Sequence, residues 1–168
     1  GSNGATLTGN FSANSIMGGS GVDLMVGGKG NDTYFVTTDD VVSEVAKEGT
    51  DLVVSGDTYT LGDNIENLIL TGSSNIHGTG NSLANFITGN SGNNSLDGGI
   101  SNATLAALDT LVGGDGNDTY FVRNSADIVV ESLNGGADLV LAFADYSLAS
   151  DVENLTLANT VISGVGNA

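Results

Sequence analysis

Short apolar runs recur along the chain at a regular interval. From Gly9 to Phe35 the interval is nine residues, made of about six turn-forming residues followed by about three apolar or β-branched ones. Runs of this length, separated by Gly, Asp, Asn and Thr, are typical of strands joined by tight turns. Two such units would make one coil, and alternate turns would then stack at the β spacing of about 4.8 Å.

The strand pattern continues beyond residue 36, although the units become longer. No segment shows a helical period, and the absence of proline fits stacked strands because proline would delete a ladder hydrogen bond from a central strand. The sequence therefore predicts an all-β fold, a right-handed parallel β-roll or β-solenoid, in one domain spanning residues 1–168. Further strands are expected at 41–45, 51–54, 59–61, 65–70 and 76–77, and from Asp127, Ala137, Asp145, Asp151 and Val161.

The chain contains an internal duplication. GGKGNDTYFV, from Gly27 to Val36, returns with one residue changed as GGDGNDTYFV, from Gly113 to Val122. The second copy lies 86 positions after the first (113 − 27). We therefore expect two homologous tandem halves, approximately residues 3–80 and 81–168.

The duplicated segment has the composition of a tight turn that leads into a strand. Its glycines can adopt backbone angles closed to other residues, and they leave carbonyl oxygens free to point into the turn. Asp118 adds a carboxylate, and the residues from Thr119 to Val122 suit a half-buried strand. Carbonyl oxygens beside a carboxylate suit a hard cation such as calcium, which takes about six to eight oxygen ligands.

This segment resembles the nonapeptide G-G-x-G-x-D-x-U-x of the RTX (repeats-in-toxin) family, whose copies form calcium-binding parallel β-helices. The resemblance is carried by GGSGVDLMV from Gly18, GGKGNDTYF from Gly27 and GGDGNDTYF from Gly113. It implies that Ca²⁺ is bound in these three turns. The implied ligand positions are Gly19, Gly21 and Asp23 in the first turn, Gly28, Gly30 and Asp32 in the second, and Gly114, Gly116 and Asp118 in the third.

Three further copies depart from the RTX pattern. GNFSANSIM from Gly9 and GNSGNNSLD from Gly89 carry Asn14 and Asn94 in place of the carboxylate, which weakens any metal site there. A unit that starts at Gly98 reaches Asp109 only after an insertion around residues 102–108. Asp109 is therefore a further candidate ligand in an irregular turn.

Stacking of the coils would bring carboxylates together. We expect Asp32 to lie over the turn 9–14 and Asp118 over the turn 89–94, with Asp23 and Asp109 on the opposite edge. Carboxylates about 5 Å apart repel by roughly 3 kcal/mol at an effective dielectric near 20, and a bound dication reverses the sign. The metal-free chain is therefore expected to be loose or unfolded, and calcium to fold it. Asp39, Asp40, Asp51, Asp127 and Asp138 are candidates to complete sites on later coils, but their loops lack the glycine frame, so solvated charge is the favoured interpretation there.

The composition excludes several classes of partner. The formal net charge is -17, from 20 acidic and three basic residues, so the chain repels nucleic acid and anionic membrane surfaces. A solubilising acidic surface would explain that charge equally well, and the glycine-framed aspartates favour the calcium interpretation. Cysteine is absent, which excludes disulfides and thiolate sites, and no apolar run approaches the roughly 20 residues of a membrane span.

No catalytic constellation is visible, and the chain is predicted not to be an enzyme. His77 is the only histidine, so it cannot form half of a zinc pair and is expected to be an exposed strand-end residue. Tyr34 and Tyr120 occupy the apolar position of the repeat, which places them in the core or at its rim. IENLIL and VENLTL place Asn67 and Asn154 at equivalent positions, where hydrogen bonding within the stack is expected.

The leading functional hypothesis is a non-catalytic, calcium-binding module of a secreted or cell-surface bacterial protein, with a structural, spacer or assembly role such as a filament or surface layer. The RTX resemblance implies type I secretion, with the chain unfolded in the low-calcium cytoplasm. Two alternatives remain: a C-terminal appendage of a secreted lipase, protease or alginate epimerase, or an ice- or glycan-binding adhesin segment.

The two ends of the chain are in phase. GVGNA from Gly164, followed by NGATLTGN from Asn3, reproduces the layout of GTGNSLANFITGN from Gly78, thirteen residues in each case. No capping element is visible, and open strand edges invite pairing. Head-to-tail self-association is therefore predicted, with a piece of a longer tandem array as the alternative.

Overall fold

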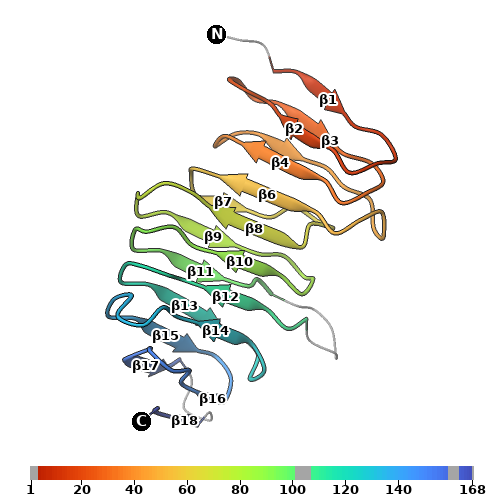
Figure 1. Cartoon of the computed structure of the whole chain (residues 1–168). Helices are drawn as coiled ribbons and strands as arrows, with labels where there is room; N and C mark the ends of the chain where they lie inside the picture. Colours follow the sequence, from red (N-terminus) through yellow and green to blue (C-terminus); the bar gives the residue numbers. More distant parts are fainter. Residues whose placement is uncertain (1–3, 101–106, 159–162, 168) are drawn as a thin grey trace.

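The chain winds into an all-parallel β-solenoid, as the fold class predicted (Figure 1). The computed structural model describes residues 4–100, 107–158 and 163–167. Short strands joined by turns alternate between two faces, and the coils succeed one another from the N-terminal to the C-terminal end of the stack. None of the described residues forms a helix long and apolar enough to cross a membrane.

The odd-numbered strands make up one face of the solenoid. They pair in parallel in two sheets, ordered β1-β3-β5 and β7-β9-β11-β13-β15-β17. Their bounds are β1 Thr6–Thr8, β3 Leu24–Val26, β5 Val41–Val42, β7 Tyr59–Thr60, β9 His77–Thr79, β11 Ser95–Asp97, β13 Thr119–Val122, β15 Leu139–Ala142 and β17 Asn154–Leu157.

The even-numbered strands make up the other face. They also pair in parallel, as a sheet that runs from β2 through every even strand to β14 and as the pair β16-β18. Their bounds are β2 Ser15–Met17, β4 Thr33–Val36, β6 Leu52–Ser55, β8 Asn67–Leu70, β10 Phe86–Thr88, β12 Thr110–Val112, β14 Ile128–Val130, β16 Tyr146–Ser147 and β18 Gly164–Val165.

The strand spacing confirms the period that the sequence predicted. The strands β1 to β4 begin at residues 6, 15, 24 and 33, nine apart each time. Every later expected segment contains or adjoins a strand, although several are shorter than predicted. The last one, expected from Val161, is Gly164–Val165, while residues 161–162 and the inserted residues 102–106 lie outside the described part of the chain.

The strands β1 to β9 are matched in order by β10 to β18. For example, β4 and β13 both read TYFV, and β8 and β17 read NLIL and NLTL. Equivalent strands are nine apart in the order of strands, and because nine is an odd number they fall on opposite faces. The interruptions of the sheets show this offset, since the odd-numbered face is interrupted between β5 and β7 and the even-numbered face between β14 and β16. Equivalent turns therefore lie on opposite edges. We call the edge formed by turns after odd strands the first edge, and the other the second edge.

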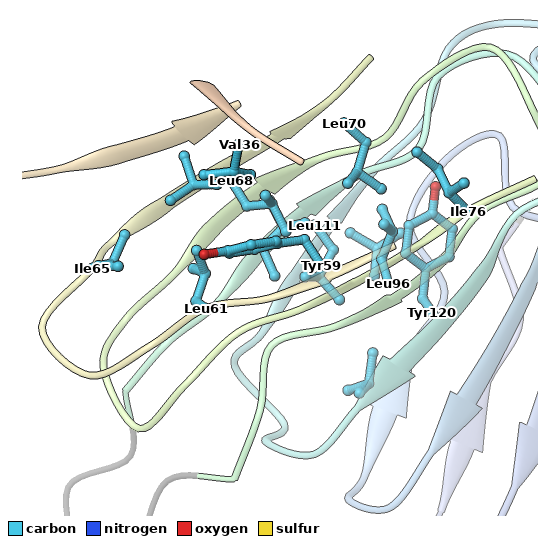
Figure 2. Close-up of a cluster of buried hydrophobic side chains, with 14 of the residues drawn as sticks. Val36, Tyr59, Leu61, Ile65, Leu68, Leu70, Ile76, Leu96, Leu111 and Tyr120 are labelled. Carbon is cyan, nitrogen blue, oxygen red and sulfur yellow. The ribbon is translucent and has the colours of Figure 1, made fainter. Parts of the chain in front are cut away.

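The hydrophobic core fills the space between the two faces (Figure 2). In β3, β4, β8 and β11 a residue in the middle of the strand, Met25, Tyr34, Leu68 and Leu96 respectively, points inward and is fully buried. Burying each such side chain contributes about 1.5–3 kcal/mol. Tyr34 and Tyr120 are both 0% exposed, so their predicted place in the core is confirmed.

Candidate metal centres

The glycine turns adopt the backbone conformation that the sequence predicted. All six glycines named as candidate ligands have a positive φ, for example 88° at Gly19 and 116° at Gly116. A Cβ on Gly30 would also lie 2.6 Å from the backbone of Ser12 in the preceding coil. Glycine is therefore required there for the turn and for the close stacking of successive turns.

The predicted stacking of the aspartates is present. The backbone amide of Asn14 donates to Asp32 Oδ1 at 2.6 Å, and that of Asn94 donates to Asp118 Oδ1 at 2.7 Å. Asp23 precedes β3 and so lies on the opposite edge from Asp32, as predicted. Asp109 likewise lies opposite Asp118, and the odd number of strands places it on the same edge as Asp32.

Each carboxylate is in turn stacked on one from the following coil. The amide of Asp32 donates to Asp51 Oδ1 at 2.8 Å, and the amide of Asp118 donates to Asp138 Oδ1 at 2.7 Å. One oxygen of each aspartate is therefore satisfied by the backbone, and the second oxygen is left for another partner.

The first carboxylate cluster consists of Asp32, Glu44 and Asp51 on the first edge. One carboxylate oxygen from each lies within 4.8 Å of the other two, and all three residues are buried. The backbone amide of Gly27 donates to Glu44 Oε1 at 3.0 Å, and the Tyr34 hydroxyl donates to the same oxygen.

The second carboxylate cluster consists of Asp118, Glu131 and Asp138 on the second edge. Its three carboxylate oxygens also lie within 4.8 Å of one another. The Tyr120 hydroxyl donates to Glu131, as Tyr34 does to Glu44. The same constellation has thus formed twice, at equivalent places in the two halves.

Buried oxygens in these clusters have no hydrogen-bond partner. Asp32 Oδ2, Asp118 Oδ2 and Asp138 Oδ2 are unpaired, although their residues are at most 1% exposed. An unsatisfied buried polar atom costs about 1–3 kcal/mol, and each carboxylate pair at this separation repels by about 3 kcal/mol at an effective dielectric of 20. A hard cation with oxygen ligands would satisfy the free oxygens and remove the repulsion, so the residues present fit calcium.

The same crowding is visible in the acidities. Burial raises the pKa of Asp51 to about 6, with a further increase from the charge of Glu44. In the second cluster burial raises the pKa of Asp118 to about 6 and that of Glu131 to about 7. Burial also raises the pKa of Asp32 and of Asp138. Without a cation, these carboxyls therefore bind protons more readily than exposed carboxyls do.

The glycine turns and their aspartates are shared with known proteins. A model of the RTX calcium-binding nonapeptide repeat, in four copies, matches residues 1–34, 79–105 and 106–129, which together are half of the sequence. The chain belongs to the RTX calcium-binding nonapeptide repeat family. No solved structure matches it.

One curated relative, the endo-1,3-1,4-beta-glycanase ExsH of Rhizobium meliloti strain 1021, is 38% identical over 95 residues. The match covers 55% of this chain and 20% of the relative. The matched part of the chain thus corresponds to about a fifth of that protein's length.

The clusters extend beyond the RTX repeats themselves. Asp32 and Asp118 lie inside the matched residues, whereas Glu44, Asp51 and Glu131 lie outside them, as does Asp138. Each cluster thus combines one RTX aspartate with two carboxylates from the longer turn of the next coil.

The prediction of solvated charge is wrong for four of the five aspartates whose loops lack the glycine frame. Asp40, Asp51, Asp127 and Asp138 are all buried, and only Asp39 is exposed as expected. A parallel stack places every turn residue above a turn residue of the preceding coil, so a turn needs no glycine frame of its own to lie against an RTX turn.

Sequence reasoning missed Glu44 and Glu131 altogether. A signal was present, because each glutamate follows the duplicated TYFV and precedes a similar sequence, GTDLV from Gly49 and GADLV from Gly136. A carboxylate kept at the same place in both halves of a duplication, outside the recognised repeat, marks a position with a shared structural role.

Asp23 and Asp109 are not brought together with two further carboxylates among the described residues. Asp23 Oδ1 accepts from the Ala5 amide at 2.6 Å, and its buried Oδ2 is unpaired. Asp109 accepts from the Asn85 amide at 2.8 Å, and burial raises its pKa to about 7. Their role as ligands therefore stays a proposal.

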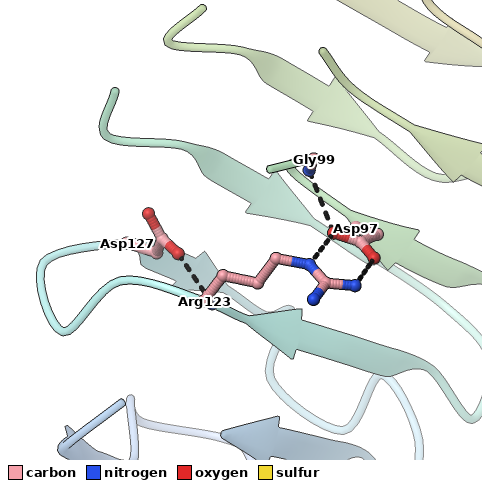
Figure 3. Close-up of polar contacts among 4 residues, drawn as sticks. All are labelled: Asp97, Gly99, Arg123 and Asp127. Atoms are coloured by element: carbon pink, nitrogen blue, oxygen red, sulfur yellow. Dashed lines mark hydrogen bonds and ion pairs between the residues drawn. The ribbon is translucent and has the colours of Figure 1, made fainter. Parts of the chain in front are cut away.

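A guanidinium neutralises the carboxylate of Asp97 on β11 (Figure 3). Arg123 donates to it through Nε at 2.9 Å and Nη2 at 2.6 Å, and its guanidinium lies 5.0 Å from the centre of the Phe143 ring. The backbone amide of Arg123 donates to Asp127 Oδ2 at 3.1 Å. Charge on this part of the stack is therefore balanced by a side chain.

The expectations for the remaining polar residues are confirmed. His77 is exposed at the first position of β9. The side-chain amides of Asn67 and Asn154 each donate at 3.0 Å to a backbone carbonyl of the preceding coil, that of Asp51 and Asp138 respectively.

Protons should partly replace the cation. The folded-state pKa values of the cluster carboxyls lie above their unfolded values near 4, so their contribution to stability is complete below about pH 4 and is lost as the pH rises through about 6 to 7.

We therefore expect the melting temperature of the metal-free protein to be several degrees higher at pH 5 than at pH 8, measured by circular dichroism. Glu131→Gln should reduce this difference and Asp39→Asn should not; a metal-free melting temperature that rises from pH 5 to pH 8 would contradict the expectation.

Proposed function

We propose that this chain is a non-catalytic calcium-binding module whose two carboxylate clusters each bind Ca²⁺. The observation that carries the proposal is the pair of equivalent clusters, in which three carboxylates converge and at least one buried aspartate oxygen has no hydrogen-bond partner. Membership of the RTX calcium-binding repeat family supports calcium as the cation.

The residues that would hold calcium come from two successive coils. In the first cluster they are Asp32, Glu44 and Asp51, and in the second they are Asp118, Glu131 and Asp138. The glycines of the adjacent RTX turns, Gly28 and Gly30 or Gly114 and Gly116, are proposed to contribute backbone carbonyls. Calcium would supply the positive charge that three converging carboxylates require, and magnesium would fit less well because it demands tight octahedral geometry.

Cation binding at these clusters would be coupled to folding. Each cluster exists only when two coils are stacked, so the unfolded chain has no preformed site and the free energy of binding adds to that of folding. Such a chain would stay loosely folded where calcium is scarce and become rigid where it is abundant. This behaviour suits a spacer or assembly element of a secreted or cell-surface bacterial protein, as does the excess of acidic residues.

An appendage of a secreted enzyme is the second candidate. The relative named as an endo-1,3-1,4-beta-glycanase favours it, although the match covers only a fifth of that protein. Both proposals give this chain the same calcium-binding role, because the clusters lie within the stacked coils in either case. Turnover of a β-glucan by the isolated chain would contradict the non-catalytic proposal.

Calcium should convert the chain from a partly disordered to a β-rich state, followed by far-UV circular dichroism. Asp32→Asn and Asp118→Asn should each remove one cluster, lowering the stoichiometry in a calorimetric titration by about one ion and the affinity of the folding transition at least about tenfold. The reason is that each variant replaces one of the three carboxylates of a cluster with a neutral amide.

The matched control is Asp39→Asn, which removes an exposed carboxylate seven residues from Asp32 (39 − 32). His77→Ala should likewise leave stoichiometry and affinity unchanged. A wild-type protein that stays fully folded in excess chelator and binds no calcium would overturn the proposed function.

We also propose that the solenoid can be continued by another copy of itself. The strands β1 and β17 each pair with one neighbour in the described part of the chain, so each presents an open edge. The last coil is built like an internal one: the side-chain amide of Asn167 donates to Ala149 O and Val152 O, as that of Asn81 does to Gly62 O and Ile65 O. The next strand of an added copy would be its β1.

Calcium-loaded protein should therefore form end-to-end oligomers whose mass rises with concentration in light scattering. Leu7→Lys should abolish them, because Leu7 packs against the core and a charge there opposes docking of β1. Thr8→Lys, at the next and outward-facing position of the same strand, is the control. Circular dichroism must show both variants folded; a monomeric wild type at millimolar concentration would refute the association.

A further inference from the structure

The coil formed by β9 and β10 is joined to the preceding coil without carboxylates. Its two turns, residues 80–85 and 89–94, each begin with glycine and asparagine but lack the positive-φ glycines of the RTX turns, and asparagine occupies the positions that face the preceding coil. The four residues concerned are Asn81, Asn85, Asn90 and Asn94. We call this set the asparagine clamp.

On the first edge the clamp binds the carbonyls of the turn 61–66. The side-chain amide of Asn81 donates to Gly62 O and Ile65 O, both at 2.7 Å. The amide of Asn85, which is 2% exposed, donates to Ile65 O at 3.0 Å and to Glu66 O at 3.2 Å.

On the second edge the clamp repeats this arrangement. The side-chain amide of Asn90 donates to Thr71 O at 3.1 Å and to Ser74 O at 3.0 Å. The amide of Asn94 donates to Ile76 O and to Asn90 Oδ1, both at 3.0 Å. Both edges of one coil are thus fixed to the preceding coil by neutral hydrogen bonds.

The amide groups do here what a cation is proposed to do in the clusters. Asn94 occupies the position of Asp118 in the nine-residue repeat, and its NH₂ group bonds two oxygens at once, Ile76 O and Asn90 Oδ1. Between residues 55 and 94 no described carboxylate is fully buried, since Asp57 and Asp63 are exposed and Glu66 is half-buried. The clamp positions therefore carry no pair of carboxylates for calcium to bring together, whereas Glu66, which accepts from the Asp51 amide at 2.8 Å, faces the first cluster.

We propose that the asparagine clamp makes the coils between the two carboxylate clusters independent of calcium, so that the metal-free chain keeps a folded centre with two calcium-dependent flanks. This inference rests on the proposed calcium binding of the flanks. In a solenoid each coil contacts only its neighbours, so a stable central pair of coils can persist while the flanks open.

The centre has a buried core of its own. Ile65, Leu68 and Ile87 are all fully buried in the coils that the clamp joins. The two clusters lie on either side, at residues 32–51 and 118–138. Folding on calcium would then extend outward from a preformed centre, which removes the cost of nucleating the first coil.

Hydrogen–deuterium exchange with peptide resolution tests the division in the full chain. In excess chelator we expect amides of residues 61–96 to exchange roughly tenfold or more slowly than those of 23–54 and 113–142, whereas in calcium all three segments should be protected. A centre that exchanges as fast as the flanks in chelator, with all segments protected in calcium, would overturn the clamp but leave the proposed function intact. Flanks equally protected with and without calcium would overturn both.

Asn94→Asp is the sharper variant. It removes two buried donors and adds a charge facing Ile76 O, so in chelator the central amides should exchange roughly tenfold or more faster than in the wild type. Calcium should restore their protection, because the turn becomes GNSGND, closer to the RTX pattern. Asn93→Asp makes the same chemical change at an exposed neighbour whose side-chain Oδ1 accepts from the Asn117 amide, and it should leave the exchange unchanged. Equal exchange in the two variants in chelator would overturn the clamp.

Discussion

Repulsion between carboxylates that are stacked on one another is the constraint on which the rest of this structure depends. Parallel pairing fixes the separation of successive coils, so whatever residues a turn carries are placed a few ångströms from those of the next turn. Aspartates suit the turns because each one accepts the amide of the coil before it, as Asp51 does from Asp32. The same arrangement leaves a second oxygen buried without a partner, and the stack can close only if something positive or hydrogen-donating meets it.

Three different groups meet that requirement along the chain. In the two clusters, two carboxylates of a longer turn join an RTX aspartate, and a cation is the group that fits. At Asp97 the guanidinium of Arg123 provides the charge. In the turns of the β9–β10 coil, side-chain amides such as that of Asn94 replace both the carboxylate and the cation. Because equivalent strands of the two halves fall on opposite faces, the clusters alternate between the edges of the solenoid.

The sequence was sufficient to predict what depends on local chemistry. The nine-residue period, the positive φ of glycines such as Gly28, the stacking of Asp32 over the turn 9–14 and the bond from Asn67 all follow from turn propensity and a fixed repeat. The place of Glu44 beside Asp51 could not be predicted in this way, because their turn, residues 43–51, is nine residues long whereas an RTX turn has about six, and its conformation depends on tertiary packing. The role of the Asn94 amide was missed for a related reason: absence of a carboxylate was interpreted as a weakened site, whereas the amide makes bonds of its own.

Anomalous diffraction from crystals grown in calcium or terbium tests the central claim most directly, since it locates the cations independently of any effect on folding. The account predicts one peak in each cluster, at coordination distance, about 2.3–2.6 Å for calcium, from Asp32, Glu44 and Asp51 and from Asp118, Glu131 and Asp138. Crystals in which both clusters lack a peak while cations occupy other positions would contradict it.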